Sequence, residues 1–274
     1  MRIAFIGGGN MANALIGGLV KRGTAPRDIL AIDVNESTRE GLAKQYGVET
    51  AGAPNDRLRD YDTLVLAVKP QVLKDVAQAL QPHLNGQLVI SIAAGIRASD
   101  LARWLGGHNQ IVRCMPNTPA LIGMGITGLA ALSGVDSDQR KRAENVLSAA
   151  GQVVWVEKES QLDAVTAISG SGPAYVFYFI EALEQAAKEL DFSPEQGRQL
   201  AIATFTGASQ LAAQSSEPVS VLRERVTSKG GTTFAALSSF DRDAIKDAIV
   251  RGVHAANKRA KELGDELGDK PNDA

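Results

Sequence analysis

The first 157 residues alternate between short apolar runs and stretches of helical length. The apolar runs lie at 2–6, 29–33, 62–68, 87–93, 111–115, 125–132 and 152–157. The helical stretches lie between most of them, at 10–21, 36–46, 71–80, 100–105 and 136–150. The run DTLVLAV at 62–68 is continuously apolar, which is typical of a parallel strand covered on both faces. This order predicts an α/β domain with a doubly wound parallel sheet over 1–157, in which Ser99 caps the helix at 100–105.

After residue 157 the strand-like runs stop and helical stretches take over. AYVFYFI at 174–180 is apolar on nearly every face of a helix predicted at 172–190. SPEQ at 193–196 has the Ser, Pro and Gln that open a helix, and a long final helix is predicted at 241–267. These helices are too few to bury their own apolar surface within one chain. We therefore expect the all-helical domain 158–274 to bury its apolar surface against a second copy of the chain.

Composition and charge narrow the class of protein. The chain has 274 residues, of which 44% are hydrophobic and 22% charged, and its formal net charge is −2. This charge provides no general attraction to nucleic acid or to an anionic membrane, and no stretch approaches the ~20 apolar residues of a membrane span. Cys114 is the only cysteine, which suits a reducing compartment. We expect a cytoplasmic protein that binds neither nucleic acid nor membrane, and in which Cys114 serves packing.

The segment FIGGGNMA at 5–12 joins the first predicted strand to the first predicted helix. It carries the pattern G-x-G-x-x-A, in which Gly7 permits the tight turn, Gly9 leaves room for a pyrophosphate and Ala12 lets the helix pack near the strand. The N–H groups at the start of the helix would face the phosphates. The pattern alone is weak, but its place between a strand and a helix favours a Rossmann-like dinucleotide site over a turn without a ligand.

Asp33 ends the second predicted strand, where cofactors with and without a 2′-phosphate are distinguished. An acidic residue there binds the ribose hydroxyls and disfavours a 2′-phosphate, which favours NADH. Asn35 and Arg39 follow closely, however, and an Arg can accommodate that phosphate. The alternative is that Asp33 caps the next helix. The choice between NADH and NADPH therefore stays open.

Further candidates follow the other strands, whose carboxyl ends face the ligand crevice of such a sheet. AVKP at 67–70 and AAG at 93–95 end two buried runs. Lys69 lies either near the nicotinamide or phosphate, or in solvent as an ordinary turn residue. MPNTP at 115–119 also follows a strand, and its prolines stiffen the chain around the amide of Asn117.

Two segments interrupt the helical half, SGSGP at 169–173 and TSKGGTT at 227–233. Both combine hydroxyl groups with glycines, which let a ligand approach the backbone closely. Helix capping by Ser171 and Thr232 is the alternative interpretation. Two such loops in a chain with a dinucleotide domain nevertheless favour a substrate pocket.

The usual acid–base and nucleophilic groups are sparse. The three histidines have no partner motif, and the sequence contains neither a metal-ligand cluster nor a nucleophile elbow. The chemistry is therefore expected to be one that a nicotinamide performs with little help from the protein. Reduction of a protonated imine fits, because its carbon is already electrophilic and needs an aligned hydride.

Taken together, these segments resemble the pyrroline-5-carboxylate reductase family. The resemblance is carried in the family's order and spacing by FIGGGNMA, AVKP, SIAAG (91–95), RCMPNTP (113–119), DAVTAISGSGPAY (163–175) and VTSKGGTT (226–233). The last two segments are specific to the family, whereas the first occurs in many dehydrogenases. The resemblance implies NADPH- or NADH-dependent reduction of L-1-pyrroline-5-carboxylate to L-proline, the last step of proline biosynthesis.

The resemblance also implies roles for individual residues. The cofactor would be bound by Ile6, Gly7, Gly8, Gly9, Asn10, Met11, Asp33, Asn35, Asn55, Ala67, Val68, Lys69, Pro70, Ala93, Ala94, Gly95 and Asn117. The substrate would be contacted by Glu159, Ser171, Gly172, Gly231, Thr232 and Thr233. Thr233 would be the catalytic contact, with its hydroxyl on the ring nitrogen. The family pattern also places Arg225 toward the cofactor and Glu217 toward the substrate, although residue type and spacing vary at these positions. The resemblance implies no metal.

The family also implies assembly, because its members pair their helical domains into homodimers and many build decamers from five dimers. Asp33 departs from the small or basic residues of strongly NADPH-dependent members, which weakens the expectation of NADPH. A β-hydroxyacid dehydrogenase is a second interpretation, but it requires an asparagine four residues after Lys188, where this chain has Phe192. A non-catalytic cofactor sensor is a third interpretation, and such a protein needs no second pocket.

Overall fold

The computed structural model describes residues 1–268 and divides into two compact units. Among the described residues, the sheet unit comprises 1–171 and 256–268, and the helical unit comprises 172–255. The sequence-based boundary between 157 and 158 falls at the end of the last strand. The short helix α6 (Gln161–Val165) and the π-helical turn η6 (Thr166–Gly170) follow that strand and belong to the sheet unit.

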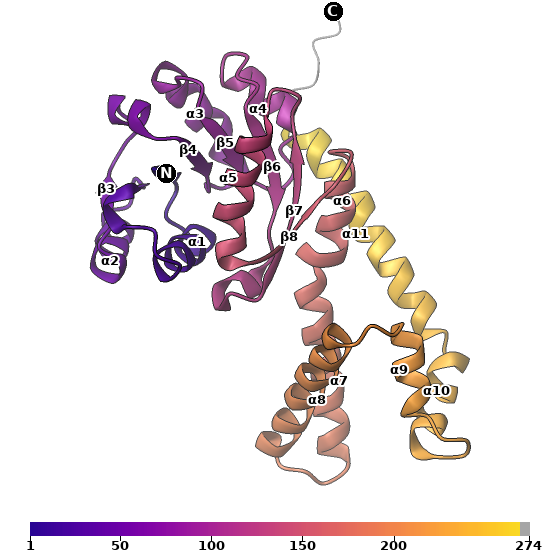
Figure 1. The fold of residues 1–274 in the computed structure, drawn as a ribbon. Helices are drawn as coiled ribbons and strands as arrows, with labels where there is room; N and C mark the ends of the chain where they lie inside the picture. The colour runs from indigo at the N-terminus through magenta and orange to yellow at the C-terminus, as the bar shows by residue number, and fades with distance from the viewer. Residues whose placement is uncertain (269–274) are drawn as a thin grey trace, which may run out of the picture. The chain divides into compact units, whose positions relative to one another are not determined.

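The sheet unit contains an eight-stranded sheet among the described residues (Figure 1). Its strands are β1 (Ile3–Ile6), β2 (Ile29–Ile32), β3 (Glu49–Ala51), β4 (Thr63–Leu66), β5 (Leu88–Ser91), β6 (Ile111–Met115), β7 (Gly125–Ala131) and β8 (Gly151–Trp155). Their order is β3-β2-β1-β4-β5-β6-β7-β8. All neighbours are parallel except β6 and β7, so β7 and β8 run opposite to the first six strands. The predicted Rossmann-like α/β fold is confirmed, with this antiparallel pair as an addition.

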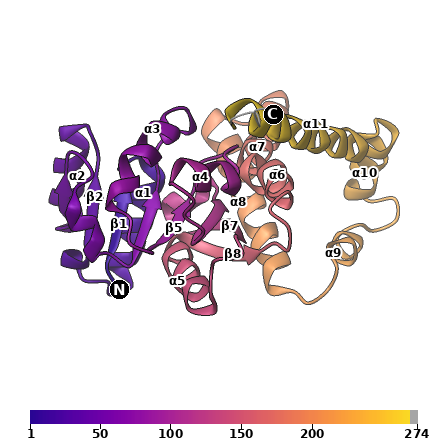
Figure 2. The same cartoon turned by 90° about the horizontal axis from the view of Figure 1, so that it is seen from above.

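Helices cover both faces of the sheet, and Figure 2 shows α3 and α5 on opposite sides of it. The helices are α1 (Asn10–Lys21), α2 (Glu36–Tyr46), α3 (Pro70–Leu80), α4 (Ala98–Trp104) and α5 (Ser137–Leu147). Strand side chains alternate, so Ile3 and Phe5 pack with α1 and α5, whereas Ala4 and Ile6 pack with α3 and α4. Cys114 lies in the first of these clusters, as expected of a packing residue, and burial raises the pKa of its thiol.

Several local predictions for the sheet unit need correction. The sequence pattern missed β3, whose residues are exposed or half-buried and form no apolar run. The strands predicted at 62–68 and 87–93 end earlier, at Leu66 and Ser91, so AVKP and AAG lie beyond the strands. Ser99 does not cap a helix, because α4 begins one residue before it and has Arg97 at its N-cap without a side-chain bond.

The helical unit is formed by α7 (Gly172–Glu189), α8 (Pro194–Gln214), α9 (Val219–Arg225), α10 (Thr232–Arg242) and the first part of α11 (Ile245–Leu267). Ser193 and Gln196 form the predicted capping box at the start of α8. The long final helix predicted at 241–267 is confirmed as α11, but it begins four residues later than predicted, because residues 241–242 belong to α10 and the chain turns before Ile245. Ala244 has a φ of 50° at that turn, a conformation that a continuous helix does not contain.

The helical unit exposes much apolar surface. No residue of α7, α9 or α10 is buried, and Phe177 and Tyr178 of α7 are 59% and 73% exposed. An exposed apolar surface of this kind marks an interaction site. This exposure fits the expectation of a second copy of the chain. Within residues 1–268, no helix combines the length and apolar character needed to cross a membrane.

The contact of α1 with the 3-10 turn Ser148–Ala150 (η5) allows a test of the packing. A Cβ on Gly18 would overlap the backbone carbonyl of Ala149, which cannot yield as a flexible side chain would. We expect Gly18→Ala to lower the free energy of unfolding by roughly 1–3 kcal/mol. Gly41→Ala in α2 is the matched control, because nothing lies within 4 Å of its Cβ, and it should stabilise by about 0.5–1 kcal/mol. Urea unfolding measures both values, and equal effects would contradict the described contact.

Candidate active site

The predicted cofactor-binding segments follow neighbouring strand ends. In the register of the sheet, Ile6 of β1 pairs with Ile32 of β2 and with Leu66 of β4, and Leu66 pairs with Ser91 of β5. The segments after these residues therefore begin side by side at the carboxyl edge. β1 lies between β2 and β4, where the strand order changes direction. Sheets of this kind bind ligands at that position.

The glycine loop after β1 is shaped by close backbone contacts. Gly7 has a φ of 100°, and a Cβ there would lie 2.6 Å from the carbonyl oxygen of Ala67, so glycine is required. Gly9 is the N-cap of α1, where no side chain caps the helix, and nothing lies within 4 Å of the position of its Cβ. Ala12 is buried against the sheet. The start of α1 is therefore open to an anion, and these residues fit the pyrophosphate of a dinucleotide.

Asp33 links the glycine loop to the turn after β2. Its Oδ2 accepts a hydrogen bond from the Gly8 N–H at 2.7 Å, and its Oδ1 accepts one from the Asn35 N–H at 2.8 Å. The capping alternative is wrong, because Asn35 is the N-cap of α2. Arg39 donates to two carbonyls of the same turn, at 2.8 and 3.1 Å. A carboxylate has about four acceptor positions, so the Asp33 oxygens can still accept from ribose hydroxyls.

The segments after β4 and β5 differ in exposure. Lys69 is exposed at the N-cap of α3 and makes no capping bond, and Pro70 occupies the first helical position. Ala93 is buried and Ala94 is exposed. Gly95 has a φ of 77°, and a Cβ there would meet Leu267 of α11 at 3.0 Å. Ala67 and Val68 are half-buried beside the glycine loop.

Two asparagines assigned to the cofactor have structural bonds of their own. Asn117 donates through Nδ2 to the Ser169 carbonyl at 3.1 Å and accepts through Oδ1 from the Ile126 N–H at 2.9 Å. It therefore ties the MPNTP segment to the turn that leads into SGSGP. Asn55 caps the 3-10 turn Asp56–Asp60 by accepting from the Arg57 N–H. Their part in cofactor binding stays a prediction.

Glu159 lies in a cluster of charged groups next to these strand ends. Its Oε1 accepts from Arg113 Nη1 at 2.9 Å and from the Ala98 N–H at 2.7 Å. Arg113 Nη2 lies 3.6 Å from a carboxylate oxygen of Asp163. Glu159 was predicted from the resemblance alone, and the roles of Arg113 and Asp163 were not predicted from the sequence. The available signal was a single arginine within an apolar strand.

The SGSGP segment follows an irregular helical turn. The Ser171 N–H donates to the Thr166 carbonyl, five residues earlier, which is the bond of a π-helix. A Cβ on Gly170 would lie 2.6 Å from the Met115 side chain, so this turn packs closely on the end of β6. Ser171 does not cap a helix, because it lies between η6 and α7 with helical backbone angles. Such π-helical turns are frequent at functional sites.

The GGTT segment lies in the helical unit, at the start of α10. Gly231 is the N-cap, and Thr232 and Thr233 are the first two residues of the helix. Thr232 is exposed and does not cap the helix, which corrects the alternative interpretation, whereas Thr233 is half-buried. A Cβ on Gly231 would lie 2.5 Å from Ser228 Oγ. The N-terminus of α10 has no side-chain cap and can accept an anionic group.

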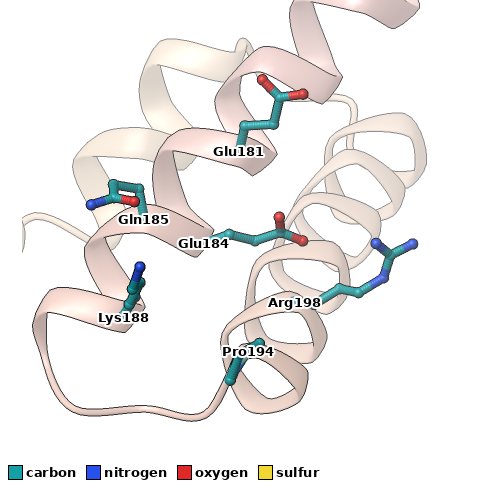
Figure 3. Close-up of a pocket in the computed structure, with 6 residues that line it drawn as sticks. All are labelled: Glu181, Glu184, Gln185, Lys188, Pro194 and Arg198. Atoms are coloured by element: carbon teal, nitrogen blue, oxygen red, sulfur yellow. The ribbon is translucent and has the colours of Figure 1, made fainter.

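The helical unit holds two further polar features. Arg225 and Glu217 form a bidentate ion pair with each other, at 2.5 and 2.6 Å. A cavity of about 350 Å³ lies between α7 and α8 (Figure 3) and is lined by Glu181, Glu184, Gln185, Lys188, Pro194 and Arg198. None of the residues assigned to cofactor or substrate lines this cavity. In the described chain, no group of three His, Cys, Asp or Glu side chains could hold a metal ion.

Known proteins match nearly the whole chain, and two family models match separate parts of it. The model for pyrroline-5-carboxylate reductase dimerisation matches residues 159–263, and the model for NADP oxidoreductase, coenzyme F420-dependent, matches residues 2–95. The pyrroline-5-carboxylate reductase of Pseudomonas aeruginosa is 44% identical over 97% of this chain and 98% of its own length. The enzyme of Vibrio alginolyticus is 40% identical over 96% of this chain and 97% of its own length.

Solved structures agree with these matches. A pyrroline-5-carboxylate reductase from Coxiella burnetii is 38% identical and has a TM-score of 0.91, covering 96% of this chain and 98% of that one. Pyrroline carboxylate reductase from Plasmodium falciparum, solved with NADP bound, is 30% identical with a TM-score of 0.85 and the same coverage. These matches set aside the β-hydroxyacid dehydrogenase and the non-catalytic sensor. The chain therefore belongs to the pyrroline-5-carboxylate reductase family, whose members are oxidoreductases that reduce pyrroline-5-carboxylate to proline with NAD(P)H.

Proposed function

We propose that this chain reduces L-1-pyrroline-5-carboxylate to L-proline with NADH or NADPH. The observation that carries the proposal is the open N-terminus of α1 at Gly9, present in a chain that also has the family's SGSGP and GGTT segments. The names of the relatives from Pseudomonas aeruginosa and Vibrio alginolyticus, 44% and 40% identical over 98% and 97% of their own lengths, support the same substrate. Steady-state oxidation of NADH and NADPH in the presence of pyrroline-5-carboxylate tests the proposal. Absence of turnover with both cofactors would reject it.

The proposed cofactor contacts follow the strand ends. Gly7 to Met11 hold the pyrophosphate at the start of α1, and Ile6 leads into this loop. Asp33 and Asn35 receive the adenosine ribose, with Asn55 on the adenosine side. The nicotinamide is lined by Ala67, Val68, Lys69, Pro70, Ala93, Ala94, Gly95 and Asn117. The support for this set is their common position at one edge of the sheet.

The reaction requires the protein mainly to position the cofactor and the imine relative to each other. The bound dinucleotide supplies a hydride to the ring carbon of the protonated imine. The π electrons of the C=N bond then move to the nitrogen, which keeps its proton and becomes the secondary amine of proline. The Thr233 hydroxyl holds that nitrogen, and the Glu159 carboxylate offsets its positive charge. The N–H groups at the start of α10 and the Ser171–Gly172 segment receive the substrate carboxylate.

We further propose a cytoplasmic homodimer formed through the helical unit, with five dimers in a decamer. The dimer is supported by the dimerisation model over 159–263 and by the exposed apolar residues of α7. The decamer rests on the family resemblance, and the cytoplasm supplies NADH and NADPH. We expect sedimentation velocity at micromolar concentration to show dimers or decamers. A folded, active monomer under these conditions would contradict the assembly.

The charge of Asp33 is expected to set the cofactor preference. We predict that NADH is used competently and that Asp33→Ser shifts the ratio of kcat/KM values toward NADPH, because repulsion of the 2′-phosphate is removed. Affinity for both cofactors should also fall, since the Gly8 N–H loses its acceptor. Asp33→Asn is the control, because it removes the charge and keeps most of the shape. The assignment is wrong if neither variant changes the ratio.

Thr233 is expected to hold the ring nitrogen. Loss of one hydrogen bond to a charged group costs roughly 1.5–3 kcal/mol, or about ten- to a hundredfold in kcat/KM. Thr233→Ala should therefore lower kcat/KM for pyrroline-5-carboxylate by that factor and leave cofactor affinity near the wild-type value. Thr233→Ser should recover much of the activity. Thr232→Ala is the matched comparison on the same turn, because the Thr232 side chain is exposed and its proposed substrate contact is through the backbone N–H, which alanine keeps. A loss confined to Thr232→Ala would move the contact by one residue, and no loss in either would place the pocket elsewhere.

A further inference from the structure

A buried arginine lies near the carboxyl end of β6. Arg113 pairs in register with Ser91 of β5 and with Ala130 of β7. Its side chain is on the face of the sheet opposite to Val112 and Cys114, because strand side chains alternate, and it is 6% exposed. An isolated buried charge is very unfavourable, so a guanidinium in this position requires carboxylate partners.

Two carboxylates of the segment 159–163 provide these partners. Glu159 Oε1 lies 2.9 Å from Arg113 Nη1, and Asp163 Oδ1 lies 3.6 Å from Arg113 Nη2. Glu159 is 29% exposed and Asp163 only 13%, so Glu159 is the carboxylate with access to solvent or a ligand. The planar guanidinium fixes the directions of both contacts. The orientation of Glu159 therefore depends on Arg113.

The same Glu159 oxygen has a second partner in the backbone. Oε1 accepts from the N–H of Ala98, the first residue of α4, at 2.7 Å. Because Oε1 is held by two donors, the carboxylate has a defined direction. The structure gives Oε2 no hydrogen-bond partner within the described residues, so Oε2 is the oxygen that can meet a ligand.

The segment before Ala98 is held from its other side by the end of α11. Gly95 approaches Leu267, and Arg97 forms an ion pair with Asp265. Residues 256–268 belong to the sheet unit, so these contacts lie within one compact body. The segment 93–98 is thus anchored by α11 at Gly95 and Arg97, and by Glu159 at Ala98.

We propose that Arg113 is a positioning residue for the reduction. It holds Glu159 so that Oε1 fixes the segment 93–98 and Oε2 faces the ring nitrogen of the substrate. Arg113 thereby fixes the position of the substrate contact relative to Ala93–Gly95, the residues assigned to the nicotinamide. This inference rests on the proposed function, which makes those assignments. Because Arg113 acts on the relative position of the reacting groups, its loss should lower kcat more than it raises KM for either substrate.

A double-mutant cycle with Arg113→Lys and Glu159→Gln tests the inference. Lys keeps the charge but has no planar fork, and Gln keeps the size of Glu159 without its charge. We expect each single variant to lower kcat about tenfold or more, with the KM for NADH within about twofold of wild type. The double variant should lose little more than Glu159→Gln alone, because both changes break the same link. Arg113→Met should lose more than Arg113→Lys. If Arg113→Met does not fold, the cycle with Lys decides.

Asp100→Asn provides the matched control. Asp100 is a buried carboxylate on α4, paired with Arg103 at 2.6 Å and outside the proposed site. Its loss should lower the melting temperature and keep kcat. If Arg113→Lys behaves in the same way, with lower stability and unchanged kcat, Arg113 is structural and the inference fails. Losses that multiply in the double variant would also overturn it, because they would show that the two residues act independently.

Hydrogen–deuterium exchange separates this inference from the proposed function. Wild-type protein without turnover in the steady-state assay would reject the proposed function by itself. The Ala98 amide should exchange slowly in wild type and in Asp100→Asn, and at least about tenfold faster in Arg113→Lys, whatever the substrate is. Unchanged exchange at Ala98 in Arg113→Lys would remove the link from Arg113 to the segment 93–98 and overturn the inference even in an active enzyme.

Discussion

The candidate site depends on the burial of the central strands on both faces. Nearly every residue of β1, β2, β4 and β5 is within the core, so these strands carry apolar side chains on both sides of the sheet. Around these four strands, polar groups that could bind a ligand are therefore confined to the segments that follow the strands. The parallel register brings these segments together at one edge, and Gly7 allows two of them to approach within backbone contact.

Polar side chains at this edge form hydrogen bonds with backbone groups of the protein itself. Asp33 accepts from Gly8, Asn117 links the π-helical turn η6 to the start of β7, and Glu159 accepts from Ala98. Loops at a sheet edge lack the hydrogen bonds of a ladder, and these side chains replace them. The groups assigned to the ligands are thus the same groups that give the loops one conformation. Substitutions here change both the shape of the site and its chemistry, which is why conservative variants are informative.

The predictability of each feature follows from the range of the interactions that create it. The strands and the glycine loop were predicted, because apolar runs and a G-x-G-x-x-A turn are local patterns. The strand β3 was missed because its pairing with β2 stabilises it without an apolar run. The turn at Ala244 could not be predicted, because neither Gly nor Pro lies in the sequence around it. Arg113 and Glu159 are 46 residues apart, so their contact exists only once β6 and the turn before α6 are folded together.

The two units differ in how far one copy of the chain can stabilise them. The sheet unit has two continuous apolar clusters that hold the proposed cofactor residues in place. The helical unit buries little, yet it carries Gly231, Thr232 and Thr233 at the start of α10. A helix without a core of its own gains its stability from a partner, and that stability then depends on protomer concentration. Cofactor binding should therefore tolerate dissociation better than turnover does, because turnover alone needs the threonines in a fixed position.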